Sequence, residues 1–204
     1  MAAAAKARPS IEQSVLFGDV IARAASYPRE RVAETALELL AVRPEDAVLE
    51  LGCGSGHLLG LVAARAQRGL VAGIDPAELM VRHARFRNRR FLSRGRLEVR
   101  LGASDDLSAW PEARFDTVYG LHMVYFWRMP ERDLAEIRRV LRPGGRLVLG
   151  FCPEEEAARG HGIARPHCSL ARAEQWLQDA GFEAIAVRLE WDDGRPLAWL
   201  CAQR

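Results

Sequence analysis

Lysine is almost absent from this 204-residue sequence: Lys6 stands alone, and arginine supplies the remaining positive charge. The formal net charge is only +2 at pH 7. A dedicated nucleic-acid-binding protein needs many uncompensated cations to neutralise phosphates. The near balance of charge therefore argues against that class, and we interpret the preference for arginine as a bias of composition.

Long apolar runs and closely spaced cysteine pairs are also missing. No run approaches the ~18 apolar residues that indicate a membrane-spanning helix, and the opening residues 1–8 lack the longer apolar core of a signal peptide. The cysteines form no C-x-x-C pair and no dense framework, which favours a reducing compartment. They are Cys53, Cys152, Cys168 and Cys201. We therefore expect a cytoplasmic protein without a membrane partner.

The chain is organised around residues 48–59. An apolar run that contains one acid, Glu50, ends abruptly in Gly52, Gly54 and Gly56, and apolar residues at helical spacing then resume. This pattern predicts a buried strand, a tight turn and a helix. Glycine permits positive φ and close approach of a ligand to the backbone, and the free N–H groups of a helix start favour a polar or anionic group. The turn is therefore a candidate cofactor site.

The spacing of the glycines bears on which cofactor binds. The dinucleotide fingerprint G-x-G-x-x-G would place its third glycine at position 57, where this chain has His57. A nicotinamide-dependent oxidoreductase is therefore disfavoured. A second apolar run, residues 70–74, ends in Asp75. An acid at the tip of the next strand is well placed to accept hydrogen bonds from both hydroxyls of a ribose.

Beyond Pro44, strand and helix patterns alternate. Strands are expected near 47–51, 70–74, 96–101, 115–120 and 145–151, and helices near 56–68, 77–90 and 131–141. Alternation of this kind predicts a parallel sheet with helices on both faces. Right-handed crossovers then place a ligand at the carboxyl ends of the strands. The glycine turn, Asp75, the 102–106 loop and the 120–128 loop should gather there.

The flanking segments complete the predicted domain organisation. Residues 1–43 are expected to form two helices, about 10–25 and 29–41, that either cap the ligand or cover a sheet edge of the domain formed by 44–204. Residues 152–168 are expected to be a loop, either a lid or a plain connector. After a helix that follows Ser169, two final strands near 183–191 and 196–201 are joined by a hairpin turn.

Four stretches in this order resemble one family. E-L-G-C-G-S-G (residues 50–56) after a strand, with G-I-D-P (73–76) ending the next, is similar to the class I S-adenosylmethionine-dependent methyltransferases. Residues 115–120 resemble that family's fourth strand, and 139–149 resemble its following helix, turn and fifth strand. The resemblance covers about residues 30–200. It implies an α/β fold, a Rossmann-like three-layer sandwich whose mostly parallel seven-stranded sheet ends in a C-terminal antiparallel hairpin strand.

The resemblance also implies S-adenosylmethionine as cofactor, S-adenosylhomocysteine as product, and a set of binding residues. The glycine turn and Glu50 would lie at the amino-acid end of the cofactor, Asp75 at the ribose and Met80 beside the adenine. The full set is Glu50, Gly52, Cys53, Gly54, Ser55, Gly56, Asp75, Pro76, Met80, Ser104, Asp105, Gly120 and Leu121. Where the family commonly has aspartate this chain has Ala103, so either Ser104 or Asp105 is the candidate for the adenine contact.

Residues after the fourth strand should face the methyl acceptor. His122, whose ordinary pKa is near 6.5, and Tyr125 are the candidate catalytic residues. The alternative for His122 is packing beside the cofactor, and Tyr125, Phe126 and Trp127 either line an acceptor pocket or belong to the core. The N-P-P-[YF] signature of methylation on bases and glutamine is absent, which lowers the case for DNA-base methylation.

Eight arginines between residues 82 and 100 form the other notable cluster. They are Arg82, Arg85, Arg87, Arg89, Arg90, Arg94, Arg96 and Arg100. A solvated face is the simpler interpretation than an RNA-binding one. The cysteines and histidines between 152 and 168 match no common zinc spacing, so no metal is expected.

Together these features predict a methyltransferase that acts on a small molecule, mainly by positioning cofactor and nucleophile. The alternatives are methyl transfer to RNA or protein, and a non-catalytic nucleotide- or RNA-binding module that uses the arginine-rich 82–100 face. The sequence leaves the acceptor, the methylated atom and the oligomeric state open.

Overall fold

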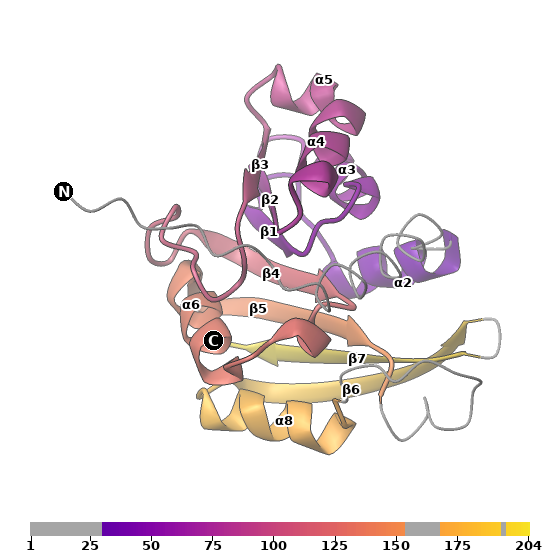
Figure 1. Cartoon of the computed structure of the whole chain (residues 1–204), viewed down its shortest axis with the longest axis vertical. Helices are drawn as coiled ribbons and strands as arrows, with labels where there is room; N and C mark the ends of the chain where they lie inside the picture. Colours follow the sequence, from indigo (N-terminus) through magenta and orange to yellow (C-terminus); the bar gives the residue numbers. More distant parts are fainter. Residues whose placement is uncertain (1–29, 154–167, 193–194) are drawn as a thin grey trace.

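A computed structural model describes residues 30–153, 168–192 and 195–204 (Figure 1). The helix predicted near 10–25, most of the loop predicted at 152–168 and the centre of the final hairpin turn lie outside the described residues. The helices are α2 (Glu30–Leu40), α3 (His57–Arg65), α4 (Glu78–Arg87), α5 (Arg89–Leu92), α6 (Pro130–Val140) and α8 (Leu170–Asp179), with a 3-10 turn, η1 (Val124–Phe126). The strands are β1 (Val48–Leu51), β2 (Val71–Asp75), β3 (Leu97–Leu101), β4 (Phe115–Leu121), β5 (Leu141–Phe151), β6 (Glu183–Asp192) and β7 (Arg195–Gln203).

The seven strands form one sheet in the order β3-β2-β1-β4-β5-β7-β6. The first five are parallel, and β7 runs antiparallel to both β5 and β6. Strands β1 and β2 are buried along their whole length, as is expected of parallel strands covered on both faces. The predicted Rossmann-like α/β fold with a C-terminal antiparallel hairpin is confirmed.

Each face of the sheet packs against its own layer of helices. One core joins α6 and α8 to the sheet through residues such as Leu134, Ile137 and Leu177. The other core joins α2, α3 and α4 through residues such as Leu40 and Val62. Figure 1 shows α4 and α5 at one end of the molecule and α8 with β6 at the other. The structure is therefore a three-layer sandwich with two separate apolar cores.

Helix α2 belongs to the second of these cores. Its buried face contributes Val32, Ala36 and Leu40, and the helix contacts both α3 and β5. The Arg146 guanidinium of β5 donates hydrogen bonds to the last carbonyl groups of α2, at Leu39 and Leu40, which have no partner within the helix. Helix α2 thus packs directly on the sheet of the domain.

Two predicted boundaries differ from the structure. The helix expected at 77–90 is divided into α4 and α5 at Asn88. The fifth strand begins at Leu141, four residues before the predicted start, because buried Leu141 is extended and pairs with Phe115 of β4. In the part of the chain that the structure describes, there is no helix long and apolar enough to cross a membrane.

Candidate cofactor site

The glycine turn connects β1 to α3 in a conformation that L side chains rarely adopt. The φ angles of Gly52, Gly54 and Gly56 are +64°, +51° and +73°. A Cβ built on Gly54 meets no atom within 4 Å, so the space beside its backbone is open. A polar ligand can therefore approach the turn directly, as the alternating glycines predicted.

Gly56 has a different role from Gly54. A Cβ on Gly56 would lie 2.6 Å from Asn88 Nδ2 and 2.8 Å from the Cβ of Ala84 in α4. The buried Asn88 side chain donates from Nδ2 to the carbonyl oxygens of Gly56, at 2.8 Å, and Ala84, at 3.0 Å. Asn88 thus joins the turn to the end of α4. Sequence reasoning missed this residue, because its only local signal was a polar residue at a helix boundary.

Asp75, at the end of β2, links the turn to the start of α4. Its Oδ2 accepts a hydrogen bond from Gly54 N at 2.8 Å, and its Oδ1 accepts one from Ala77 N at 2.9 Å. Burial raises the pKa of this carboxyl, and the two N–H groups partly offset that effect. Each carboxylate oxygen has a second lone-pair direction, so two further donors can bind there.

Glu50 of β1 lies opposite Tyr119 of β4 in the sheet register. Among the described residues, neither Glu50 Oε2 nor the Tyr119 hydroxyl has a hydrogen-bond partner, although both atoms are buried. Burial raises the pKa of Glu50 to about 8; the adjacent Tyr119 hydroxyl partly offsets this effect, and the nearby Asp75 charge adds to it. An unpaired buried carboxyl is costly, so a cationic group placed beside it would be strongly favoured.

The remaining predicted cofactor residues, which lie in the glycine turn, after β2, in α4 and at the end of β4, differ in how far they are exposed. Cys53 is buried, with its Sγ beside Gly73, so its backbone rather than its thiol faces the turn. Ser55 and Leu121 are half-buried, Gly120 and Met80 are buried, and Pro76 is exposed.

Met123, which sequence reasoning did not single out, covers two of the predicted glycines. Its Cβ lies 3.3 Å from a Cβ built on Gly52, and its Cγ 2.6 Å from one built on Gly120. Both glycines lie at the carboxyl ends of neighbouring strands. The Met123 side chain therefore packs across the ends of β1 and β4. Met123 lies two residues beyond the end of β4, and nothing in the local sequence indicated that its side chain packs against these glycines.

Ser104 and Asp105, the two candidates for the adenine contact, are in opposite situations. The buried Ser104 hydroxyl donates to Asp133 Oδ1 and accepts from Trp127 Nε1 at 3.0 Å. Burial raises the pKa of Asp133 to about 6. Asp105 is exposed. The Ser104 hydroxyl is thus used in joining the 102–106 loop to α6, while Asp105 remains accessible at the same edge.

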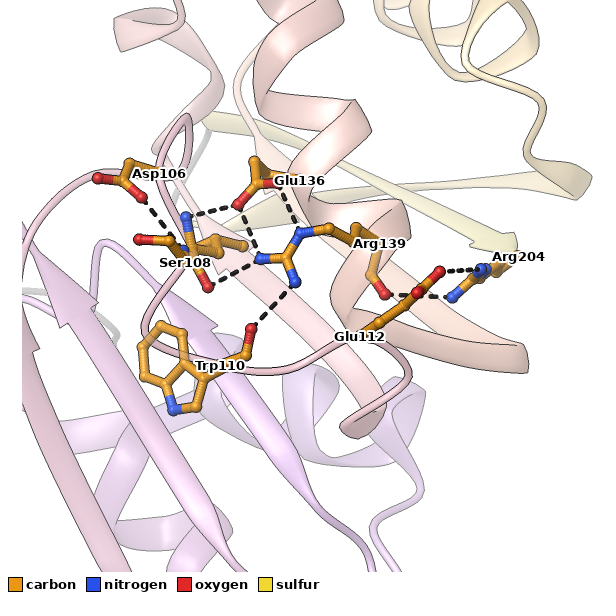
Figure 2. A network of polar contacts seen from close by, with 8 residues as sticks. Asp106, Ser108, Trp110, Glu112, Glu136, Arg139 and Arg204 are labelled. Atoms are coloured by element: carbon orange, nitrogen blue, oxygen red, sulfur yellow. Dashed lines mark hydrogen bonds and ion pairs between the residues drawn. The ribbon is translucent and has the colours of Figure 1, made fainter.

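The segment that follows this loop is held by Arg139 of α6 (Figure 2). The guanidinium donates to the carbonyl oxygens of Leu107, at 2.9 Å, and Trp110, at 3.0 Å, and pairs with Glu136 at 2.7 Å. Glu136 in turn accepts from Leu107 N at 2.9 Å, and the Arg139 hydrogen bond lowers its pKa. These contacts fix the backbone of the loop that carries Asp105.

His122 and Tyr125 lie together beyond the end of β4. Their rings stack at 17° with centroids 6.2 Å apart, and His122 Nδ1 is 3.3 Å from the Tyr125 hydroxyl. The hydroxyl also contacts the backbone of Cys152 after β5. His122 has φ of +57°, and its N–H donates to Gly150 O at 2.7 Å. The backbone therefore leaves the sheet sharply at His122, which brings the two predicted catalytic side chains together.

The arginine-rich segment occupies α4, α5 and β3, at the far edge of the sheet from β6. Several of its guanidinium groups donate to backbone carbonyls rather than point only to solvent: Arg85 to Val99, Arg87 to Ser55 and Arg96 to Ala63. Arg100 pairs with Glu98. Arg89 lies over the exposed Phe86 ring, at 5.2 Å. Much of this cluster thus supports local structure.

The fold and the site together define an α/β protein with an open glycine turn and two buried acidic side chains, Glu50 and Asp75, toward the carboxyl ends of its parallel strands. Residues 49–149 match a family model described as the methyltransferase domain. The chain belongs to the class I S-adenosylmethionine-dependent methyltransferases, and S-adenosylmethionine is the cofactor of this domain. Within the described residues, no group of histidine, cysteine or acidic side chains is arranged to hold a metal ion.

Relatives of the chain include methyltransferases of different substrates. A demethylmenaquinone methyltransferase from Symbiobacterium thermophilum is 38% identical over 124 residues, which cover 60% of this chain and 47% of that protein. A tRNA U34 carboxymethyltransferase from Pseudoalteromonas translucida is 29% identical over 170 residues, which cover 75% of this chain and 51% of that protein. The chain therefore spans about half the length of these two relatives.

Solved structures share the fold. The crystal structure of an S-adenosylmethionine-dependent methyltransferase from Aquifex aeolicus superposes with a TM-score of 0.69, covering 84% of this chain and 88% of that one. At 23% sequence identity, this likeness concerns the fold alone.

The two glycines of the turn should respond differently to alanine. We expect Gly56→Ala to destabilise the protein by about 2–5 kcal/mol, because the left-handed conformation and the contact with α4 both become unfavourable. Gly54→Ala should cost only about 1–2 kcal/mol, from backbone conformation, yet weaken binding of S-adenosylhomocysteine, because its methyl group enters the open space. Urea unfolding and calorimetric titration measure the two effects. Equal loss of stability in both variants would contradict this assignment.

Proposed function

We propose that the protein transfers a methyl group from S-adenosylmethionine to a small acceptor with an apolar or aromatic surface. The observation that carries the proposal is the convergence of Glu50, Gly54 and Asp75 at one edge of the sheet. The cofactor supplies an electrophilic methyl on its sulfonium. The chain would bind and orient the reactants and exclude water, which supplies most of the catalysis of an in-line displacement.

The cofactor would be held by groups of two kinds. Asp75 would accept hydrogen bonds from the ribose hydroxyls with the lone pairs that Gly54 and Ala77 leave unused, and the open backbone at Gly54 would admit the ligand. Glu50 would face the cationic amino-acid end of the cofactor, where its unpaired Oε2 gains a partner. Asp105 rather than Ser104 would approach the adenine, because the Ser104 hydroxyl already binds Asp133.

The proposed acceptor side carries more aromatic side chains than cationic ones, with Arg128 as the exposed arginine of residues 122–129. The residues that follow β4 include half-buried Tyr125 and Trp127 and the exposed Phe126 and Met129. The arginine-rich segment lies instead over β2 and β3. An apolar or planar small molecule suits such a surface better than a phosphate backbone does, so we favour it over the nucleic-acid acceptor that one relative's name indicates.

Removing the Asp75 carboxylate tests the cofactor assignment. Hydrogen bonds to a charged group contribute roughly 1.5–3 kcal/mol, so Asp75→Ala should bind S-adenosylmethionine on the order of 10–150-fold more weakly in calorimetric titration. Asp116→Ala is the matched control. Asp116 also accepts a backbone N–H, from Ala47, but it lies at the amino ends of the strands, away from the proposed site. The proposal fails if both variants bind as the wild type does, or if the folded wild type does not bind.

The raised pKa of Glu50 makes cofactor binding depend on pH. If Glu50 must be ionised to pair with the ligand cation, wild-type affinity should rise by up to about tenfold per pH unit as pH approaches 8 from below. Glu50→Gln should lack this component. Protonation of the ligand's amino group affects binding to wild type and to Glu50→Gln equally. The ratio of the two affinities at each pH therefore reports the ionisation of Glu50 alone. Parallel pH profiles would exclude the pairing.

The free protein should show the complementary effect on stability. The folded state holds the Glu50 proton up to a pKa of about 8, whereas the unfolded chain releases it near 4.5. Folding is therefore favoured by this group at low pH, and the contribution is lost as pH rises from about 4.5 to 8. As pH rises across that window, the unfolding free energy of the wild type should fall relative to that of Glu50→Gln, and a constant difference would contradict the raised pKa.

We infer that His122 acts as general base, with Tyr125 orienting its ring through Nδ1. His122→Asn keeps a residue type that tolerates the left-handed backbone but removes the base. With labelled cofactor and an extract that contains the acceptor, its turnover should fall about 10²–10⁴-fold while cofactor affinity stays within about twofold. An unchanged turnover would show that His122 only packs beside the reactants.

A further inference from the structure

Among the described residues, strand β6 forms one edge of the sheet and pairs with β7 alone. Trp191 stands opposite Pro196, which has no N–H, so these two residues do not exchange backbone hydrogen bonds. In an antiparallel pair, bonded and non-bonded positions alternate. The N–H and C=O groups of Val187, Leu189 and Trp191 therefore point to the open edge of the sheet.

The side chains of the same three residues make this edge apolar. Val187, Leu189 and Trp191 are 38%, 59% and 56% exposed and share one face of the strand. The opposite face carries Arg188 and Glu190. Natural edge strands usually avoid such a surface through proline, inward charges or bulges. Here the irregularity lies near the start of the strand, between Glu183 and Ala186, so residues 187–191 form a regular edge that no other described strand pairs with.

The charged face is held in place from within the chain. Arg188 contacts Glu38 of α2, at 3.1 Å, and Glu190, at 2.7 Å. Glu190 also accepts from Thr35 and from Trp199 Nε1, each at 3.3 Å. These contacts orient one cation and one anion two residues apart, on either side of Leu189.

The segment Val187-Arg188-Leu189-Glu190-Trp191 is complementary to itself when reversed about Leu189. In an antiparallel arrangement with a second copy, Arg188 would face Glu190 of the other copy and Val187 would face Trp191. A pair centred on Arg188 or on Glu190 would place like charges opposite each other, and a one-residue slip would mix the charged and apolar faces. The register centred on Leu189 places opposite charges together, keeps the apolar side chains on one face, and pairs the outward backbone N–H and C=O groups.

We propose that the protein associates through β6 with a second copy of itself, with a twofold axis at Leu189. The outward groups of residues 187, 189 and 191 would form about six inter-strand hydrogen bonds. The two seven-stranded sheets would join into one continuous sheet. The glycine turn after β1 and Asp75 of β2 are separated from β6 by strands β4, β5 and β7, so the association is independent of the proposed methyl transfer.

Cysteine cross-linking in the full chain tests the register directly. Opposed Cα atoms in a hydrogen-bonded antiparallel pair are about 5.5 Å apart, which suits a disulfide. Mild oxidation of Leu189→Cys should therefore give a covalent dimer, whereas Val187→Cys alone, with its copies about 13 Å apart, should not. A mixture of Val187→Cys and Trp191→Cys should cross-link. The wild type, with its native cysteines, measures the background.

Charge reversal provides the second test. In light scattering across micromolar concentrations, the wild type should have about twice the 22.7 kDa chain mass. Arg188→Glu and Glu190→Arg should each weaken association at least tenfold, and the double variant should restore it. Circular dichroism checks that each variant is folded. A monomeric wild type without a Leu189→Cys cross-link would overturn the proposal, as would cross-linking of Val187→Cys alone or a double variant as weak as the single ones.

Discussion

The carboxylate of Asp75 is the contact on which the geometry of the site depends. It accepts the Gly54 N–H from the turn after β1 and the Ala77 N–H from the start of α4, so one side chain joins the carboxyl ends of two neighbouring strands. The strands bring these groups together only because β1 and β2 are parallel and in register. Asn88 fixes the other side of the turn. The backbone that a cofactor would approach is therefore held on both sides by side-chain hydrogen bonds.

Burial sets the chemistry of this edge as much as contact does. Glu50, Asp75 and Asp133 all have raised pKa values because the sheet and its helices exclude water from them. The cost of burying each carboxyl is offset in a different way. Asp75 accepts two N–H groups and Asp133 accepts a hydrogen bond from the Ser104 hydroxyl, while Glu50 keeps one oxygen unpaired. A site that leaves one buried acid without a partner is suited to a ligand that carries a positive charge.

The sequence predicted the features that depend on local pattern. Alternating glycines, the acid at the tip of the second strand and the order of strands and helices follow from residues close together in the chain, and the fold they predicted is confirmed. Asn88, Tyr119, Met123 and Asp133 were missed, because each acts through a partner in another element. Leu141 illustrates the same limit at a boundary, since its extended conformation depends on Phe115 of β4.

Hydrogen–deuterium exchange with and without S-adenosylhomocysteine tests the central claim most directly, because it locates a bound ligand without any substitution. The account predicts slower exchange at the glycine turn, residues 52–58, and at residues 75–80 after β2, with no change along residues 187–191 of β6. Protection elsewhere in a folded protein, with the glycine turn unaffected at saturating ligand, would contradict it.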